Sequence, residues 1–237
     1  MAFGKPQDPS PKTQMDVYLV SIGPDRWECY YEAIDADEEV ERGKGFLAGL
    51  RYKFHQQLKE AENARHQAVI EEPKTIFGRI HKRSMAWIAE RIAEQRLLWH
   101  LRRAKTATLH VPSDLTPAEG ERIMREIMKR DADRHRNRLI PHSLLLILSA
   151  AVALVPGPNV LGYLFTFTVV GHFLAWRGAV NALHGVAWTV QPDPALSELR
   201  RAFSLDATDR HRVIKEVAQR LHMPKMARFV EQMSLSA

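Results

Sequence analysis

The chain has 237 residues, a formal net charge of +6 and a single cysteine. One cysteine excludes an intramolecular disulfide and a four-cysteine zinc site, and the length suits one or two folded domains. Lys, Arg, Asp and Glu make up 26% of the chain, yet none of them occurs between Ser143 and Trp176. The missing charge indicates that this segment avoids water.

Residues 1–14 are polar and rich in proline. They contain neither the apolar core of a signal peptide nor the arginine-rich amphipathic pattern of a mitochondrial presequence. The sequence therefore predicts a disordered lead.

Three segments have the composition of β-strands. Met15–Ile22 and Trp27–Ile34 are rich in β-branched and aromatic residues and flank the turn sequence Gly-Pro-Asp-Arg, which predicts a β-hairpin. Ala107–Val111, ended by Pro112, is a third candidate. Three strands are about enough for a small sheet if helices cover it.

Helical periodicity dominates the segments between and after these strands. Apolar residues recur at helical spacing over 46–58 and 85–92, and another helix is predicted from Thr116 onward. Residues 15–138 are therefore predicted to form a soluble α+β domain that is mostly α with a small β-sheet.

The uncharged segment is predicted to form a membrane-inserted helical hairpin within residues 139–190. Its two apolar stretches, Ile140–Val155 and Asn159–Trp176, would be roughly 24 and 27 Å long as helices, against a hydrocarbon core of about 30 Å. A single helix would carry two prolines at its centre, which disrupts helical hydrogen bonding. The predicted turn consists of Pro156, Gly157, Pro158 and Asn159.

Basic residues flank the predicted hairpin. Under the positive-inside rule they place both termini on the cytoplasmic or matrix side of the membrane. The alternative is a helical hairpin buried in a soluble protein, but the absence of a charged stripe on either helix favours the membrane. The predicted topology anchors are Arg134, Arg136, Arg138 and Arg177.

Polar residues in and after this segment are the candidates for chemistry. His172 is the titratable side chain well inside it, and an ionisable group in a membrane is a functional candidate by default. Asn181, His184 and Trp188 follow Arg177 at helical spacing and would line one side of a continuing helix. His172, Asn181 and His184 are thus candidate proton- or ion-facing residues. The alternatives are a neutral imidazole bonded to a backbone carbonyl, and helix packing.

Three glycines recur every seven residues along the same region. Small residues let helices approach closely in a membrane. The pattern predicts helix packing, in a homo-oligomer or against a partner membrane protein. These glycines are Gly171, Gly178 and Gly185.

Residues 191–237 are predicted to form amphipathic helices. Asp206 is a candidate N-cap, and apolar residues recur on one helical face as far as Leu221. Pro224 separates a last short helix that begins near Met226.

Signatures of enzymes and cofactor sites are absent from the sequence. There is no Walker or dinucleotide glycine pattern, no G-x-S-x-G, and no zinc spacing among the 11 histidines. No enzyme activity, cofactor or metal is expected. The basic runs HLRRAK and KRDADRHRNR raise nucleic acid as a partner, but the second is more simply an anchor for lipid headgroups, so nucleic-acid binding is not expected.

The order of these features resembles a known family. The stretches VYLVSIGPDRWECYYE and LHVPSDLTPAEGERIM, and above all the segment from Arg136 to Ala179, are similar to the mitochondrial potassium/proton exchange-related family. The most specific parts are Ile140–Pro141, the PGPN turn and Trp176–Ala179. The resemblance implies a mitochondrial inner-membrane protein connected with exchange of K⁺ for H⁺. Because the N-terminus does not resemble a presequence, a bacterial member in the bacterial inner membrane is expected.

The predicted function is therefore that of an integral membrane protein, a component or regulator of potassium/proton exchange across an energy-transducing membrane, with the lipid bilayer, K⁺ and H⁺ as partners. A K⁺ site in a bilayer needs carboxylates or unwound backbone carbonyls. The uncharged segment has no carboxylate, so one protomer is not expected to be a complete exchanger. The alternative is a membrane-anchored scaffold or assembly protein with no transport activity.

Overall fold

The computed structural model describes residues 15–32, 96–152 and 160–235, with the backbone alone at 150–152 and 160–164. The chain divides into two compact units. Unit 1 comprises Met1–Glu32, Leu101–Lys129 and Val180–Ala237, and unit 2 comprises Ala33–His100 and Arg130–Ala179. The predicted lead, the predicted helices over 46–58 and 85–92, and the turn Pro156–Asn159 lie outside the described residues.

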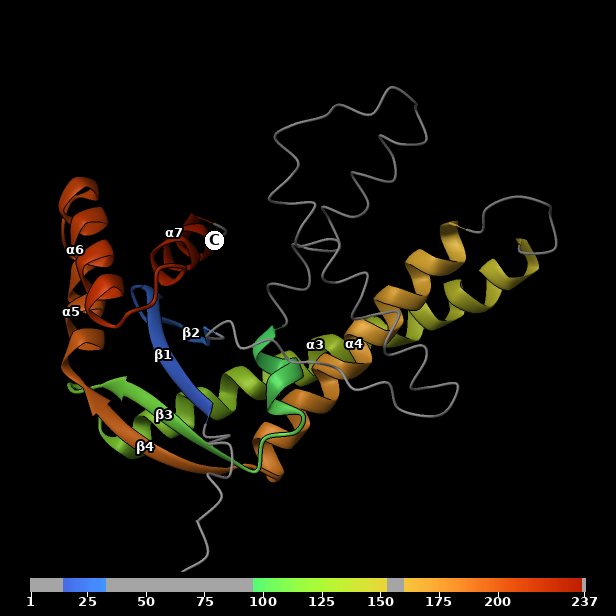
Figure 1. Cartoon of the computed structure of the whole chain (residues 1–237), viewed down its shortest axis with the longest axis horizontal. Helices are drawn as coiled ribbons and strands as arrows, with labels where there is room; N and C mark the ends of the chain where they lie inside the picture. Colours follow the sequence, from blue (N-terminus) through green and yellow to red (C-terminus); the bar gives the residue numbers. More distant parts are fainter. Residues whose placement is uncertain (1–14, 33–95, 153–159, 236–237) are drawn as a thin grey trace, which may run out of the picture. The chain divides into compact units, whose positions relative to one another are not determined.

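A four-stranded sheet forms the centre of unit 1 (Figure 1). Its order is β2-β1-β3-β4, with β1 antiparallel to β2 and parallel to β3, and β3 parallel to β4. The hairpin and the third strand predicted from sequence are confirmed. The strands are β1 Met15–Gly23, β2 Arg26–Tyr30, β3 Thr106–Pro112 and β4 Ala187–Asp193.

The turn of the hairpin contains a residue type that suits its backbone conformation. Asp25 adopts a left-handed conformation with φ of 53°, which Asp tolerates better than most residues. The pairing shifts register between Ser21 and Gly23. Beyond this irregularity Tyr18 lies opposite Tyr30, so the alternating side chains of both strands face the same core.

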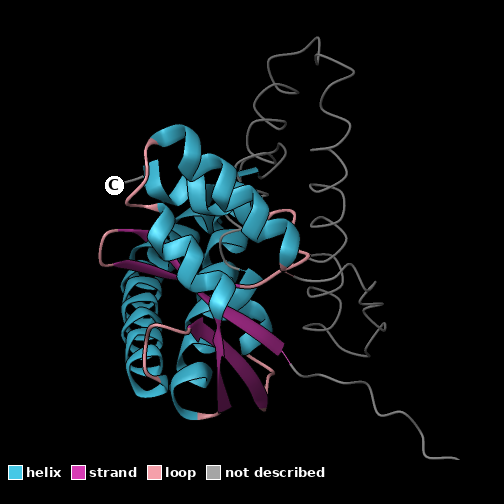
Figure 2. Cartoon of the chain, turned by 90° about the vertical axis from the view of Figure 1, so that its left-hand side faces the viewer, coloured by secondary structure: helices cyan, strands magenta, loops and turns pink. Residues whose placement is uncertain are grey.

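Three helices gather on one face of the sheet (Figures 1 and 2). They are α5 Pro194–Ala202, α6 Ala207–Arg220 and α7 Met226–Leu235. α5 and α7 pack on β1 and α6 packs on α5 and α7, so apolar side chains from all three join one buried cluster with the sheet. The buried cluster includes Val20, Ile22, Leu196, Leu199, Ile214, Val217, Met226 and Val230.

Carboxylates begin each of these helices. Asp206 caps α6 by accepting from the backbone N–H groups of Thr208 and Asp209, as the sequence predicted. Asp193 caps α5 in the same way. The backbone N–H of Lys225, just before α7, donates to the carboxylate of Glu32 at 3.3 Å, so the end of the hairpin is held at the start of the last helix.

The first turns of α3 (Pro117–Val152) belong to unit 1 and cover the sheet. Met124, Ile127 and Met128 are buried there. Gly120 lies so close to β3 that an added Cβ would come within 2.5 Å of Val111 Cγ1. A glycine at this point therefore sets how closely α3 approaches the strand.

Unit 2 is helical in its described part. It contains α3 from Arg130 onward, α4 (Val160–His184) as far as Ala179, and a short helix over 96–100. The indole N–H of Trp99 donates to the backbone carbonyl of Gly171 at 3.3 Å. The short helix therefore packs directly on α4.

The predicted fold class, mostly α with a membrane-inserted hairpin, is wrong. The fold of the described residues is mixed α/β, and no membrane-inserted hairpin is seen among them. Within 15–32, 96–152 and 160–235, no helix combines the length and the apolar character that a membrane crossing requires. α3 is continuous through Arg138 and Pro141, so its described uncharged residues belong to the same helix as the charged residues before them.

The strand β4 was not predicted, and the expected continuation of the helix through Trp188 is wrong. α4 ends at His184. The backbone N–H groups of Gly185 and Val186 both bond to the carbonyl of Asn181, which closes the helix at a glycine. Trp188 then lies in the strand, and its indole N–H donates back to Ala182 at 2.8 Å.

Candidate functional site

A pair of buried histidines lies in unit 2. His172 on α4 and His135 on α3 are each 6% exposed, and their Nδ1 atoms are 2.8 Å apart. At this distance one Nδ1–H donates to the unprotonated Nδ1 of the other ring. The two imidazoles therefore share a single hydrogen bond.

A third histidine extends the pair into a cluster. The ring centroid of His142 lies 5.2 Å from that of His172. Its Nδ1 is 2.7 Å from the backbone carbonyl of Arg138, and because a carbonyl only accepts, this nitrogen carries the proton. His135 and His142 occupy the same face of α3, seven residues apart. We call His135, His142 and His172 the histidine cluster.

Of this cluster, the sequence singled out His172. His135 was interpreted as part of a basic run, and His142 as the start of the apolar stretch. Their seven-residue spacing on a helix was the available signal. This spacing would have placed both histidines on one face of the helix, but it would not have identified α4 as the helix that this face contacts.

Asn181 and His184 belong to unit 1, whereas His172 belongs to unit 2. The side-chain nitrogen of Asn181 donates to the backbone carbonyls of Leu101 and Ala104, at 2.7 and 2.9 Å. Its amide thus satisfies backbone groups where the helix over 96–101 ends. His184 is exposed at the end of α4.

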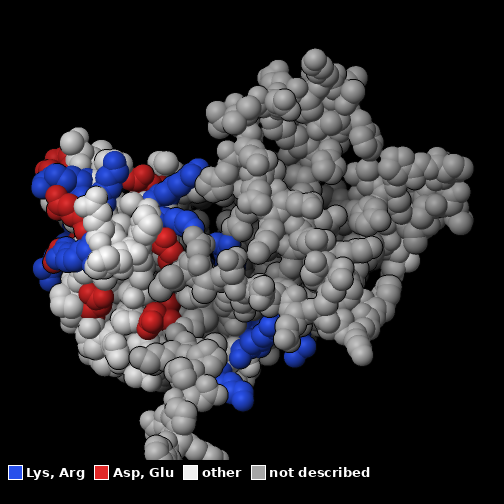
Figure 3. Space-filling view, in the orientation of Figure 1, with Lys and Arg blue, Asp and Glu red and all other residues white. Residues whose placement is uncertain are grey.

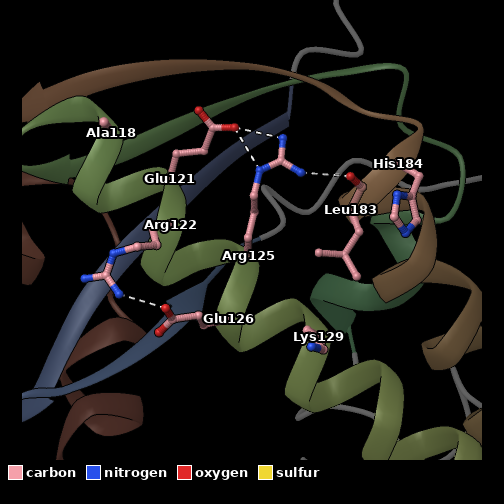
Figure 4. Close-up of a pocket in the computed structure, with 8 residues that line it drawn as sticks. All are labelled: Ala118, Glu121, Arg122, Arg125, Glu126, Lys129, Leu183 and His184. Carbon is pink, nitrogen blue, oxygen red and sulfur yellow. Dashed lines mark hydrogen bonds and ion pairs between the residues drawn. The ribbon is translucent and has the colours of Figure 1, made fainter.

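His184 also lies on the rim of a hollow of about 600 Å³ between α3 and the end of α4 (Figure 4). Arg125 crosses it: the guanidinium bonds Glu121 through Nε at 2.9 Å and donates to the carbonyl of Leu183 at 2.9 Å. A cation at the carboxyl end of a helix is favourable. Arg125 therefore holds the end of α4 against α3. The hollow is lined by Ala118, Glu121, Arg122, Arg125, Glu126, Lys129, Leu183 and His184.

The four predicted topology anchors lie in unit 2. Arg134, Arg136 and Arg177 are exposed and Arg138 is half-buried. Arg136 pairs with Asp133 at 3.1 Å. Most of the charge on α3 is therefore available to solvent.

The three predicted packing glycines have different neighbours. A Cβ at Gly178 would lie 1.7 Å from the backbone carbonyl oxygen of Leu98, so α4 and the short helix touch there without an intervening side chain. The carbonyl of Gly171 accepts from Trp99. At Gly185 a Cβ would meet the side-chain oxygen of Asn181 at 2.1 Å.

Charge on the visible surface is mixed in part. On the left of Figure 3, acidic and basic side chains are interspersed, whereas those at the lower edge beside the grey atoms are basic. This agrees with ion pairs such as Arg220–Glu198 and Arg212–Asp209. Within the part of the chain that the structure describes, no group of three or more His, Cys, Asp or Glu side chains is arranged to hold a metal ion.

Comparison with known proteins gives one match. Residues 17–184 match the model of a family described as mitochondrial K⁺–H⁺ exchange-related, which is more than half of the chain. No curated protein and no solved structure matches the chain.

Proposed function

We propose, for a chain that belongs to the mitochondrial K⁺–H⁺ exchange-related family, that it acts as a proton-responsive component or regulator of K⁺/H⁺ exchange. The family description supports the connection with exchange and with mitochondria. The role of component or regulator is the proposal, together with an energy-transducing membrane, mitochondrial or bacterial, as the place of action.

The bond between His135 and His172 carries this proposal. Unperturbed imidazoles change charge between about pH 5 and 8, the range in which cells and mitochondria operate. Both rings are 6% exposed, so water screens a positive charge on either ring poorly, and the charge acts on the side chains packed around it. A change of protonation at this pair can therefore alter the packing of α3 against α4 in response to pH.

The pair accepts one proton more readily than two. The first proton binds at Nε2 of the donating ring, and the resulting imidazolium still donates its Nδ1–H to the neutral partner, in a stronger charge-assisted bond. A second proton occupies the accepting Nδ1. The two N–H groups then face each other at the 2.8 Å separation of the nitrogens, with two positive charges in a poorly solvated place. Double protonation therefore separates α3 from α4.

The neighbouring groups bias this equilibrium. On α3, Asp131 lies one turn before His135 and Arg138 three residues after it, while the ring of His142 lies beside that of His172 in a tilted arrangement. The short helix over 96–100 carries Arg96 and His100, and its Trp99 contacts α4 beside His172. On α4, residues 168–176 carry no charged side chain. Among the described residues, the charged or ionisable groups on these elements include Asp131, Arg138, His142, Arg96 and His100.

The experiment measures exchange as a function of pH. Vesicles from a deletion strain are compared with vesicles in which the chain, or its H172N or H135N variant, has been restored. The readouts are potassium-dependent swelling and the relaxation of an imposed pH difference. We expect the restored chain to make exchange depend on pH between about 5 and 8, and each variant to flatten that dependence while retaining exchange at alkaline pH.

The matched control is H211N, which removes an exposed imidazole that pairs with Glu231 in unit 1. It should leave the pH profile unchanged. Deletion that alters neither swelling nor pH relaxation at any pH contradicts the role in exchange. If deletion abolishes exchange but the H172N and H135N variants keep the full pH profile, the role of the histidine pair in pH dependence is contradicted and the role of the chain in exchange is not.

A further inference from the structure

Five aliphatic side chains near the end of α3 are open to solvent. They all lie in unit 2, between Ile140 and Leu148. We call them the aliphatic strip. Its members are Ile140, Leu144, Leu145, Ile147 and Leu148, with exposed fractions of 73%, 57%, 42%, 68% and 57%.

The aliphatic strip occupies one side of the helix. Ile140, Leu144 and Ile147 follow the i, i+4, i+7 spacing of a single face. His135 and Ser149, on the opposite side of α3, are buried. Apolar surface in water costs roughly 25 cal/mol for each Å², so five such side chains on one face indicate a surface that is covered in use.

Basic side chains precede the aliphatic strip on the same side of α3. Arg136 lies one turn before Ile140, and Arg134 lies three turns before Leu145. Both arginines are exposed. Arg136 pairs with Asp133, and Arg134 has no ion pair among residues 96–152. The surface is therefore apolar at one end and cationic at the other.

Charge distinguishes the candidate occupants. The strip and the rest of 139–152 contain no Asp or Glu. A second copy packed in parallel would place arginine against arginine, and one packed antiparallel would place the arginines against apolar residues. Protein interfaces are also enriched in aromatic residues and Met, whereas this surface is wholly aliphatic. An apolar layer bordered by negative charge fits it better.

We infer that the aliphatic strip rests on a lipid surface with anionic headgroups. The aliphatic side chains reach the boundary between headgroups and acyl chains, about 5–10 Å deep, as on other interfacial helices. Arg134 and Arg136 lie among the headgroup phosphates, because an anionic lipid surface attracts basic residues. The contact involves one helical face lying on the surface, and it does not depend on the histidine cluster.

Flotation of the full chain with vesicles tests the inference. One vesicle set is phosphatidylcholine alone, and the other contains about one third phosphatidylglycerol to give an anionic surface. We expect the L144Q/I147Q variant to reduce the partition coefficient on anionic vesicles at least about tenfold, because two aliphatic side chains no longer leave water. Its matched control is L205Q/L235Q, which replaces two exposed leucines of unit 1.

A second flotation experiment tests the contribution of charge with the variant R134Q/R136Q. Its control, R201Q/R228Q, replaces two exposed arginines of unit 1. Removing Arg134 and Arg136 should reduce partition about 30-fold on anionic vesicles and leave it unchanged on phosphatidylcholine, at about 1 kcal/mol for each arginine. All variants should keep the circular dichroism spectrum of the parent, since the replaced side chains are exposed.

Two results overturn the inference. One is equal flotation of the strip variants and their controls. The other is flotation unaffected by L144Q/I147Q while light scattering shows that the variant loses a dimer that the parent forms, which assigns the aliphatic strip to a second copy.

Discussion

The side-chain nitrogen of Asn181 lies 2.7 Å from the backbone carbonyl oxygen of Leu101. The same nitrogen reaches a second carbonyl, that of Ala104. Asn181→Asp replaces this donor with a carboxylate that only accepts, so two carbonyls lose their partner and face a negative charge. We expect a loss of about 2–4 kcal/mol in the free energy of unfolding at pH 7, measured by urea denaturation.

The matched control is His184→Asn, one turn later and exposed, which should change stability by less than about 0.5 kcal/mol. Acidification should partly restore Asn181→Asp, because a protonated carboxyl group donates again. Parent-like stability of Asn181→Asp at pH 7 would show that the two hydrogen bonds contribute little.

Gly178 is expected to tolerate no larger residue. In Gly178→Ala the new methyl group would overlap the carbonyl oxygen of Leu98 at 1.7 Å, and a backbone atom moves only if the short helix moves. We expect a loss of about 1–3 kcal/mol or more, despite the better helix propensity of alanine. Arg177→Ala introduces the same residue at an exposed neighbouring position and should be nearly neutral. Thermal unfolding that ranks the two variants equally would exclude the clash.

The start of α3 is held by a reciprocal cap. The backbone N–H of Glu119 donates to Thr116 Oγ1 at 3.3 Å, while the Glu119 carboxylate accepts from the backbone N–H of Thr116 at 2.9 Å. This is the capping-box arrangement. Thr116→Ala should therefore lower the stability of unit 1 by about 1 kcal/mol. An unchanged urea midpoint would mean that Pro117 alone suffices to start the helix.

The ion pair between Glu198 and Arg220 makes part of the stability depend on pH. The hydrogen bond from Arg220 holds the pKa of Glu198 below its ordinary value of 4.5. A lowered pKa in the folded state stabilises the protein above about pH 4.5, and this contribution is lost as the pH falls through the folded pKa. Glu198→Gln should cost about 0.5 kcal/mol at pH 7.

This difference should shrink as the pH is lowered from 4.5 through the folded pKa, because the parent carboxylate becomes protonated as well. Stability curves of parent and Glu198→Gln, recorded by denaturation at pH 7 and at a series of acidic pH values, check the prediction. A gap of equal size throughout would mean that the substitution acts through packing and not through charge.

Local signals predicted much of unit 1. The hairpin at Gly23–Arg26, the cap at Asp206 and the helix start near Pro117 each depend on residues next to one another in the sequence. Such features are determined by turn and cap chemistry over a few residues. They could therefore be predicted without knowledge of the tertiary fold.

Features that depend on distant residues could not be predicted. Ala187–Asp193 has weak alternation and contains Pro192, so its place at the edge of the sheet depends on pairing with β3. Gly185 was interpreted as a packing residue although a glycine is also a usual helix end. Similarly, nothing next to His135 indicates that it meets His172, because this contact joins two helices.

The long connections between neighbouring strands have a consequence for synthesis on the ribosome. β1 pairs with β3 only after residues 31–105 have been made, and β4 joins after residues 113–186. The N-terminal hairpin therefore emerges early and waits with an unsatisfied edge while most of the polypeptide is translated. Non-local pairing of this kind is slow and exposes the nascent chain to aggregation, so the edge of β1 is an aggregation hazard until β3 has been made.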